Sequence, residues 1–336
     1  RTLFHSMRAW TKMDIYVKKA IIHQFSPADT ELLLADKFLN ITPKIEEYLR
    51  KKIERVYSDD AKTGVFDPEN VFLAQLSDDL LETSVTVAKL WQEEFSVSEN
   101  QKTNDLIFVQ FDKEGVEHFA FLRIALRETL THLGGEVDNP IKLTQNNLPG
   151  FGTGADEALV INLKSRKYHL IEKRIKYNGA FLNYMSDNLL QVNPTISAKK
   201  SIKTLEKTAQ KVAESFNKDD FQFQSKVKSS IFKNLEENDE LSPEKLADDL
   251  FDGNLTARLT FIDQVKEAIP EPVKFDEIDS SRQKKKFENQ KLSLSNGIEL
   301  IVPNNIYQDA ESVEFIQNDN GTYSILIKNI EDIQNK

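Results

Sequence analysis

Apolar and polar positions follow their most regular pattern between residues 197 and 216 of the chain. The apolar residues recur at steps of three and four, which is typical of an amphipathic helix. They are Ile202, Leu205, Ala209, Val212 and Phe216. Lysines recur at every fourth position, at Lys199, Lys203, Lys207 and Lys211. Because each helical residue advances by about 100°, the pattern predicts a buried apolar face and a lysine face nearly opposite it.

The helical pattern continues from residue 196 to about residue 270. After the lysine-faced helix, apolar residues again recur at four-residue steps, at Phe223, Val227, Ile231 and Leu235. Another helix is expected over 242–251, because Ser242 can cap it and Pro243 suits its first turn. Residues 255–269 complete a predicted group of helices.

The part before residue 196 mixes strands and helices. Residues 14–25 combine β-branched and aromatic side chains and predict a strand, with a second one at 31–36. Thr42 and Pro43 predict the start of a helix. A turn-rich break at 63–70 then precedes a second helical region over about 71–95.

Two strongly apolar segments follow, at 105–111 and 117–126, joined by a short polar link that contains Gly115. They predict a β-hairpin. Because both faces of each strand are apolar, the hairpin is expected in the centre of a sheet that the preceding helices cover. A long polar loop is expected at 134–156, before another strand at 158–163.

The last part of the chain carries two turn signals between alternating strands, Asn296-Gly297 and Asn320-Gly321. The sequence therefore predicts an α+β protein: an N-terminal mixed α/β domain with an antiparallel sheet, a helical middle region and a small C-terminal antiparallel β-sheet. The predicted parts are an N-terminal extension at 1–12, the α+β domain at 13–195, the helical region with its basic face at 196–270 and the small β region at 271–336.

Composition narrows the class of protein. The chain has 336 residues, 39% hydrophobic and 29% charged, which is enough to build more than one packed unit. It has no cysteine, which excludes disulfides and thiolate metal sites and fits a reducing, cytoplasmic setting. No run approaches the roughly 18 apolar residues of a membrane helix. We therefore expect no membrane partner.

Charge is distributed unevenly along the chain. Between Lys164 and Lys211 eleven Lys or Arg residues face three acidic ones, a net charge of +8, whereas the whole chain carries −10. The remainder therefore carries −18. Within this window the candidate nucleic-acid-binding residues are Arg166, Lys167, Lys173, Arg174, Lys176, Lys199, Lys200, Lys203, Lys207 and Lys211. The alternative is that the lysine row is simply a solvated helix face, since spacing alone identifies no ligand.

No combination of residues predicts a catalytic centre. The histidines are isolated, at His5, His23, His118, His132 and His169, and show no metal-ligand spacing. The glycine-rich segment 150–154 precedes a strand and lacks the lysine of a phosphate loop, so it predicts an ordinary loop. Adjacent acidic pairs point apart on a helix and do not converge on a metal. We expect a protein that is not an enzyme and has no cofactor or metal.

Several short segments resemble the bacterial nucleoid-associated protein family of the NdpA type. They are AIIHQ at 20–24, RVY at 55–57, TGVF at 63–66, QKVAESF at 210–216, the segment at 292–307 and TYSILIKN at 322–329. The chain departs from that family's pattern at 166–191, where it carries a longer Lys- and Arg-rich insert. The resemblance implies a non-enzymatic cytoplasmic protein that associates with the bacterial nucleoid.

The resemblance leaves the mode of association open. Lysine ammonium groups reach phosphates but lack the bidentate fork that reads bases, so direct DNA contact would be independent of sequence. The alternative is an adaptor that binds chromosome-maintenance proteins through its acidic surface and reaches the nucleoid indirectly. An enzyme acting on nucleic acid is a third, weaker hypothesis. A homodimer would double the lysine row, although no heptad pattern predicts one.

Overall fold

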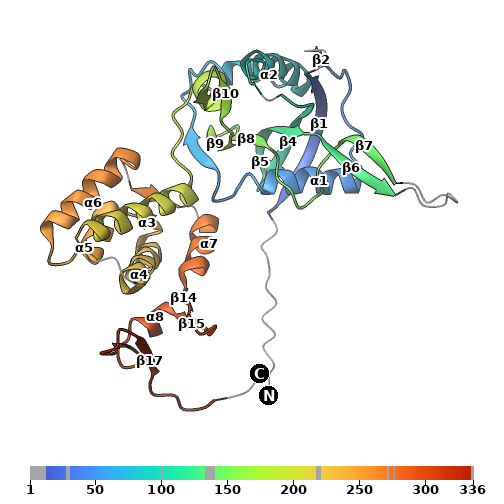
Figure 1. The fold of residues 1–336 in the computed structure, drawn as a ribbon. Coiled ribbons are helices and arrows are strands. Elements are labelled where there is room, and N and C mark those ends of the chain that lie inside the picture. The colour runs from blue at the N-terminus through green and yellow to red at the C-terminus, as the bar shows by residue number, and fades with distance from the viewer. Residues whose placement is uncertain are drawn as a thin grey trace. The chain divides into compact units, whose positions relative to one another are not determined.

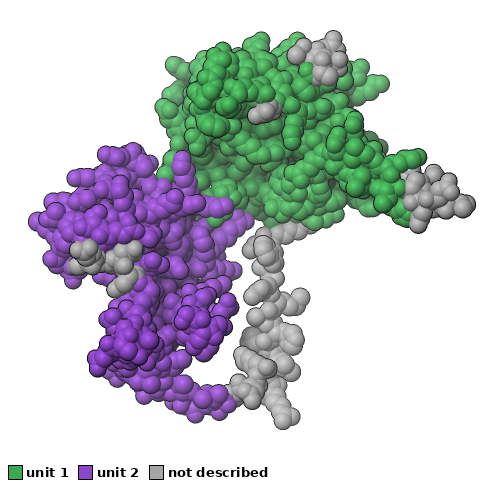
Figure 2. Space-filling model, in the orientation of Figure 1, with its two compact units in different colours: residues 1–197 green, residues 198–336 purple. Residues whose placement is uncertain are grey.

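The structure is a computed structural model that describes residues 13–27, 31–99, 101–132, 141–216, 221–270, 272–275 and 277–333. The predicted extension at 1–12 lies outside these residues. The chain forms two compact units, residues 1–197 and 198–336 (Figure 2). The predicted division of the second half near residue 270 stays a prediction.

Unit 1 is built on a seven-stranded antiparallel sheet with the strand order β2-β1-β4-β5-β8-β9-β3 (Figure 1). Its strands are β1 Ile15–Ser26, β2 Glu31–Leu33, β3 Lys62–Val65, β4 Asn104–Lys113, β5 Val116–Ala125, β8 Glu157–Asn162 and β9 Lys167–Ile171. The β4–β5 hairpin occupies the centre, as its two apolar faces predict. Helices α1 Pro43–Glu54 and α2 Leu80–Phe95 pack on opposite faces of the sheet.

The two faces of the sheet have separate cores, one for each helix. Phe108 and Phe121 lie in the cluster that contains Trp91 of α2. Their strand neighbours Ile107 and Leu122 lie in the cluster of α1. Because successive strand residues point to opposite faces, an uninterrupted apolar run supplies both cores at once. This confirms the predicted arrangement of a central hairpin covered by helices.

Three predictions for unit 1 are wrong in detail. The polar segment expected as a loop at 134–156 contains β7, Ile141–Asn147, which pairs with β6, Arg127–His132. Most residues of this ribbon are exposed, so no apolar alternation marked the strand. The break at 63–70 begins with β3, which pairs with β9 at the edge of the sheet. The second helix also starts later than expected, because Asp79 caps it by accepting from the amide of Leu81.

Gly64 in β3 is required by close packing. A Cβ atom at this position would lie 2.3 Å from the hydroxyl oxygen of Tyr168, whose side chain is buried. We expect Gly64→Ala to lower the free energy of unfolding by about 1–3 kcal/mol, because the buried ring has to move. Chemical denaturation of the full chain measures the loss. Gly152→Ala is the control, since nothing lies within 4 Å of its Cβ position. Equal stability of the two variants would contradict this account.

The remaining elements of unit 1 follow β9. A short hairpin is formed by β10 Ile175–Tyr177 and β11 Ala180–Leu182. It leads into a π-helical turn, Met185–Leu189, whose buried residues join the core on the α2 side. The chain then reaches the end of the unit at residue 197.

Unit 2 is mainly helical, as predicted, with two β-hairpins near its end. Its helices are α3 Ala198–Ser215, α4 Phe221–Asn238, α5 Pro243–Leu250, α6 Leu255–Ala268, α7 Glu277–Phe287 and α8 Asn304–Tyr307. The strands are β12 Glu240–Leu241, β13 Val273–Lys274, β14 Asn289–Ser293, β15 Glu299–Pro303, β16 Val313–Gln317 and β17 Tyr323–Ile327. The α+β fold class is confirmed.

Two details of unit 2 differ from the sequence prediction. The C-terminal strands form two separate two-stranded sheets, β14–β15 and β16–β17, in place of one. The expected glycine turns are present, with Gly297 and Gly321 at φ values of +86° and +80°. Helix α7 was not predicted, because residues 277–287 are mostly polar and carry no apolar stripe.

Candidate nucleic-acid interface

Helix α3 presents the lysine face that its sequence predicts. Its apolar stripe is buried, with Ile202, Leu205, Ala209 and Val212 at most 1% exposed. Phe216 at the end of the stripe is half-buried. On the other side, five lysines are exposed: Lys199, Lys200, Lys203, Lys207 and Lys211. The lysine face from Lys199 to Lys211 extends for roughly 18 Å along the helix axis.

The lysine face keeps much of its charge available to a partner. Within the described part of the chain, Lys203, Lys207 and Lys211 take part in no salt bridge with an acidic residue. Glu206 is the one acidic residue between Lys199 and Lys211 in the sequence. A row of uncompensated ammonium groups at this spacing attracts polyanions, and its attraction falls as salt screens it.

The basic residues predicted in unit 1 are more closely tied to their own fold. Lys173 Nζ lies 2.6 Å from Asp156 Oδ1, and Lys176 Nζ lies 3.1 Å from Glu99 Oε2. Arg166, at φ +59°, donates from Nε to the carbonyl oxygen of Phe66 at 3.2 Å. Two of the five basic side chains predicted in unit 1 are therefore neutralised by carboxylates, and a third is held by a backbone carbonyl.

The other two basic candidates of unit 1 are exposed. Lys167 begins strand β9, and Arg174 places its guanidinium 5.9 Å from the centre of the Phe181 ring. All five residues belong to unit 1, whereas the lysine face of α3 belongs to unit 2. The predicted basic window is therefore divided between two units, and the lysine face of α3 is its larger uninterrupted part.

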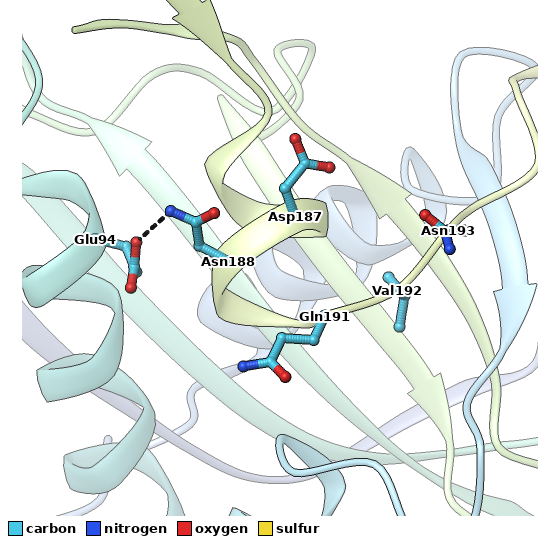
Figure 3. A pocket seen from close by; sticks show the side chains of 6 residues that line it. All are labelled: Glu94, Asp187, Asn188, Gln191, Val192 and Asn193. Atoms are coloured by element: carbon cyan, nitrogen blue, oxygen red, sulfur yellow. Dashed lines mark hydrogen bonds between the residues drawn. The ribbon is translucent and has the colours of Figure 1, made fainter.

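Figure 3 shows a polar pocket of unit 1, about 640 Å3 in volume. It is lined by Glu94, Asp187, Asn188, Gln191, Val192 and Asn193. Asn188 donates from Nδ2 to Glu94 Oε2 at 2.7 Å, while the Asp187 carboxylate points away from them (Figure 3). Among the described residues, no three His, Cys, Asp or Glu side chains gather closely enough to hold a metal ion. Carboxylates in the wall also disfavour a phosphate ligand.

A buried polar network lies between α2 and the sheet of unit 1. Arg123 donates from Nε to Glu157 Oε2 at 2.5 Å and from Nη1 to Asn104 Oδ1 at 2.8 Å. The hydroxyl of Tyr184 also donates to Glu157, and the indole of Trp91 donates to that hydroxyl at 2.9 Å. Burial, and then the Glu157 carboxylate, raise the pKa of Tyr184 well above its ordinary value. Because Glu157 is 0% exposed, this network is structural and no substrate reaches it.

The buried lysine of α1 holds the glycine-rich loop in place. Lys52 Nζ donates to the carbonyl oxygens of Gly150 at 2.8 Å and Thr153 at 2.5 Å. The side chain is 0% exposed, and burial lowers its pKa from 10.5 to about 8. The loop predicted at 150–154 is therefore an anchored connection of the fold.

This burial predicts a pH dependence of stability. The pKa of Lys52 is about 8 in the folded chain and near 10.5 when unfolded, so the unfolded chain binds more protons between these values. We expect the Lys52 contribution to the free energy of unfolding to rise with pH from about 8 to 10.5, by at most about 1.4 kcal/mol per pH unit. Lys52→Met removes this contribution while keeping the packed side chain.

Urea denaturation of both proteins between pH 7.5 and 10 tests this prediction. Buried tyrosines that do not adjoin Lys52, such as Tyr168, are present in both proteins, so their titration cancels in the difference. The stability difference between wild type and variant should grow more favourable to wild type as pH rises. A difference that does not change with pH would contradict the prediction.

A comparison of the sequence with models of protein families finds a match that covers most of the chain. The model of the family described as nucleoid-associated protein YejK matches residues 21–334, which include parts of both units. The chain belongs to the YejK family. The resemblance to a bacterial nucleoid-associated protein family is thereby confirmed. A comparison with curated proteins finds no match.

Membership of the YejK family associates the chain with the nucleoid. None of the helices in the described residues is both long and apolar enough to span a membrane.

Two histidines of this YejK-family chain, His23 and His118, are buried in unit 1. His23 hydrogen-bonds Ser84 Oγ at 2.9 Å and accepts from the Ala35 amide at 3.0 Å. Both ring nitrogens of His23 are thus used within the fold.

Proposed function

We propose that this nucleoid-associated protein contacts DNA directly and without sequence preference, through the lysine face of α3. The observation that carries the proposal is the exposure of Lys199, Lys203, Lys207 and Lys211 opposite the buried stripe from Ile202 to Val212. Family membership supports an association with the nucleoid. We propose further that the protein is not an enzyme, needs no cofactor and acts in the cytoplasm.

Physical chemistry favours phosphate contact over base reading. A lysine ammonium is a point charge that pairs with phosphate oxygens, whereas base recognition uses planar, bidentate groups such as arginine and asparagine. Phosphate contacts position a protein on the duplex and carry no sequence information. The acidic remainder of the chain is repelled by DNA, so contact is restricted to the basic face.

Fluorescence anisotropy of a labelled random-sequence duplex tests the proposal across a salt series from 50 to 200 mM. About four phosphate contacts predict a log–log slope near −3.6, which weakens binding roughly 150-fold over that range. A second duplex of unrelated sequence should bind with the same affinity.

The competing adaptor hypothesis predicts a different result. An adaptor that reaches the nucleoid through chromosome-maintenance proteins has no need of DNA affinity of its own. Absence of binding at 50 mM salt would reject direct contact and direct the search to protein partners. Strong preference for one duplex over the other would reject the sequence-independent mode.

A further inference from the structure

A second basic cluster lies on α7, at Arg282, Lys284, Lys285 and Lys286. Near the start of α7, Ser280 Oγ donates to Asp239 Oδ1 at 2.5 Å. Just beyond its end, Gln290 Nε2 donates to the carbonyl oxygen of Ser225 at 2.9 Å. These two attachments place α7 antiparallel to α4, with the basic cluster alongside α4. Helices α3, α4 and α7 are neighbours within unit 2, since α4 packs against both of the others (Figure 1).

The lysines of this cluster have different surroundings. Lys284 is neutralised, because its Nζ lies 2.9 Å from Asp239 Oδ1. Lys286 is exposed, and its Nζ lies 5.2 Å from the ring centre of Phe287, which is buried. In the described part of the chain, Lys286 has no acidic residue within salt-bridge distance. Its charge is therefore available at the surface.

Glu206 marks the place where these helices meet. It is half-buried on α3, next in sequence to Lys207. Burial raises the pKa of its carboxyl, and the ammonium groups of Lys286 on α7 and Lys228 on α4 oppose that rise. Because α4 packs on both α3 and α7, Lys228 and Lys286 approach Glu206 of α3, which is next in sequence to Lys207 of the lysine face.

We propose that the DNA-binding surface is composite: Lys228 of α4 and Lys286 of α7 flank Glu206 and widen the lysine face of α3. This inference rests on the proposed function and names further contact residues for it. Packed helices lie about 8–10 Å apart, so Lys228 of α4 adds charge at about that distance from α3, and Lys286 of α7 adds charge beyond α4. A basic surface wider than one helix reaches phosphates on both sides of a DNA groove, which is about 6 or 12 Å wide.

Glu206 opposes binding at the centre of this surface. Its carboxylate repels phosphate and offsets part of the charge of the neighbouring lysines. We expect Glu206→Gln to raise affinity for the duplex about twofold or more, since one like charge at close range is removed. A Glu69→Gln variant, which removes an exposed carboxylate of unit 1 away from the lysine face, is the matched control.

The test compares salt slopes for the same random-sequence duplex. With two added contacts the composite surface predicts a wild-type slope near −5.4, and the variant Lys228→Gln/Lys286→Gln should flatten it by about 1.8, to the −3.6 expected for α3 alone. The control is Lys245→Gln/Lys274→Gln, which removes two exposed lysines of the same unit and should leave the slope unchanged. Circular dichroism establishes that each variant folds. Glu206→Gln gives an independent readout, because its affinity should rise instead of fall.

The possible results separate the two proposals. If the wild type binds DNA but the Lys228/Lys286 variant has the slope of the control, the composite surface is wrong and direct contact through α3 still holds. If the wild type does not bind, the proposed function itself is wrong. If Glu206→Gln leaves affinity unchanged while the wild type binds, Glu206 does not lie within the contact surface, which also overturns the inference.

Discussion

Reversing the charge of the lysine face should abolish DNA binding. In a chain with Lys199, Lys203, Lys207 and Lys211 all changed to Glu, we expect affinity for a random-sequence duplex at 100 mM salt to fall by about a thousandfold or more. Each phosphate contact releases counterions worth roughly eightfold in affinity at that salt concentration. The four new carboxylates add repulsion. Fluorescence anisotropy measures the loss.

The matched control changes the same number of charges elsewhere. Lys37, Lys44, Lys89 and Lys142 are exposed on unit 1, and within the described residues none of them forms a salt bridge. Their replacement by Glu alters the net charge of the chain equally. We expect this control to lose far less affinity than the α3 variant. Equal losses would show that total charge, and not the face of α3, governs binding.

The largest effect on stability is expected in the buried network of unit 1. Glu157→Gln removes the carboxylate that pairs with Arg123, and both side chains are less than a tenth exposed. Leaving a buried guanidinium without its counter-charge typically costs about 3–5 kcal/mol. We expect a loss of that size in the free energy of unfolding, measured by urea denaturation.

An exposed ion pair provides the comparison. Glu47 pairs with Lys51 one turn along α1, and both side chains are at least 40% exposed. Glu47→Gln should cost less than about 1 kcal/mol, because solvent screens the pair. A double variant, Arg123→Met/Glu157→Gln, should lose less than the sum of its single changes, since neither charge is then left unpaired. Additive losses would contradict coupling between the two residues.

The sequence predicts those elements whose pattern is local. The stripe from Ile202 to Val212 determines α3, and the uninterrupted apolar runs of β4 and β5 determine the central hairpin. Segments held mainly by backbone hydrogen bonds leave no such pattern. The exposed ribbon of β6 and β7, the edge strand β3 and the polar helix α7 were missed for this reason.

The candidate site is predictable only in part, because charge pairing depends on tertiary structure. The partner of Lys176 is Glu99, far away in sequence. The count of basic residues between 164 and 211 therefore overstates the positive charge that unit 1 presents to a ligand. Lys286 lies outside the basic window at 164–211, and its approach to Glu206 depends on how α7 packs on α4. A usable signal for the buried network did exist, since Arg123 is the charged residue within an otherwise apolar strand segment.

Protection of individual lysines from acetylation tests the central claim most directly. The full chain is treated briefly with an acetylating reagent, with and without a random-sequence duplex at 50 mM salt, and each lysine is quantified by mass spectrometry. Direct contact through α3 predicts protection of Lys203, Lys207 and Lys211, which weakens as salt rises. The exposed lysines Lys37 and Lys89 of unit 1 should react equally in both samples. Protection confined to unit 1, or no protection anywhere, would contradict the account.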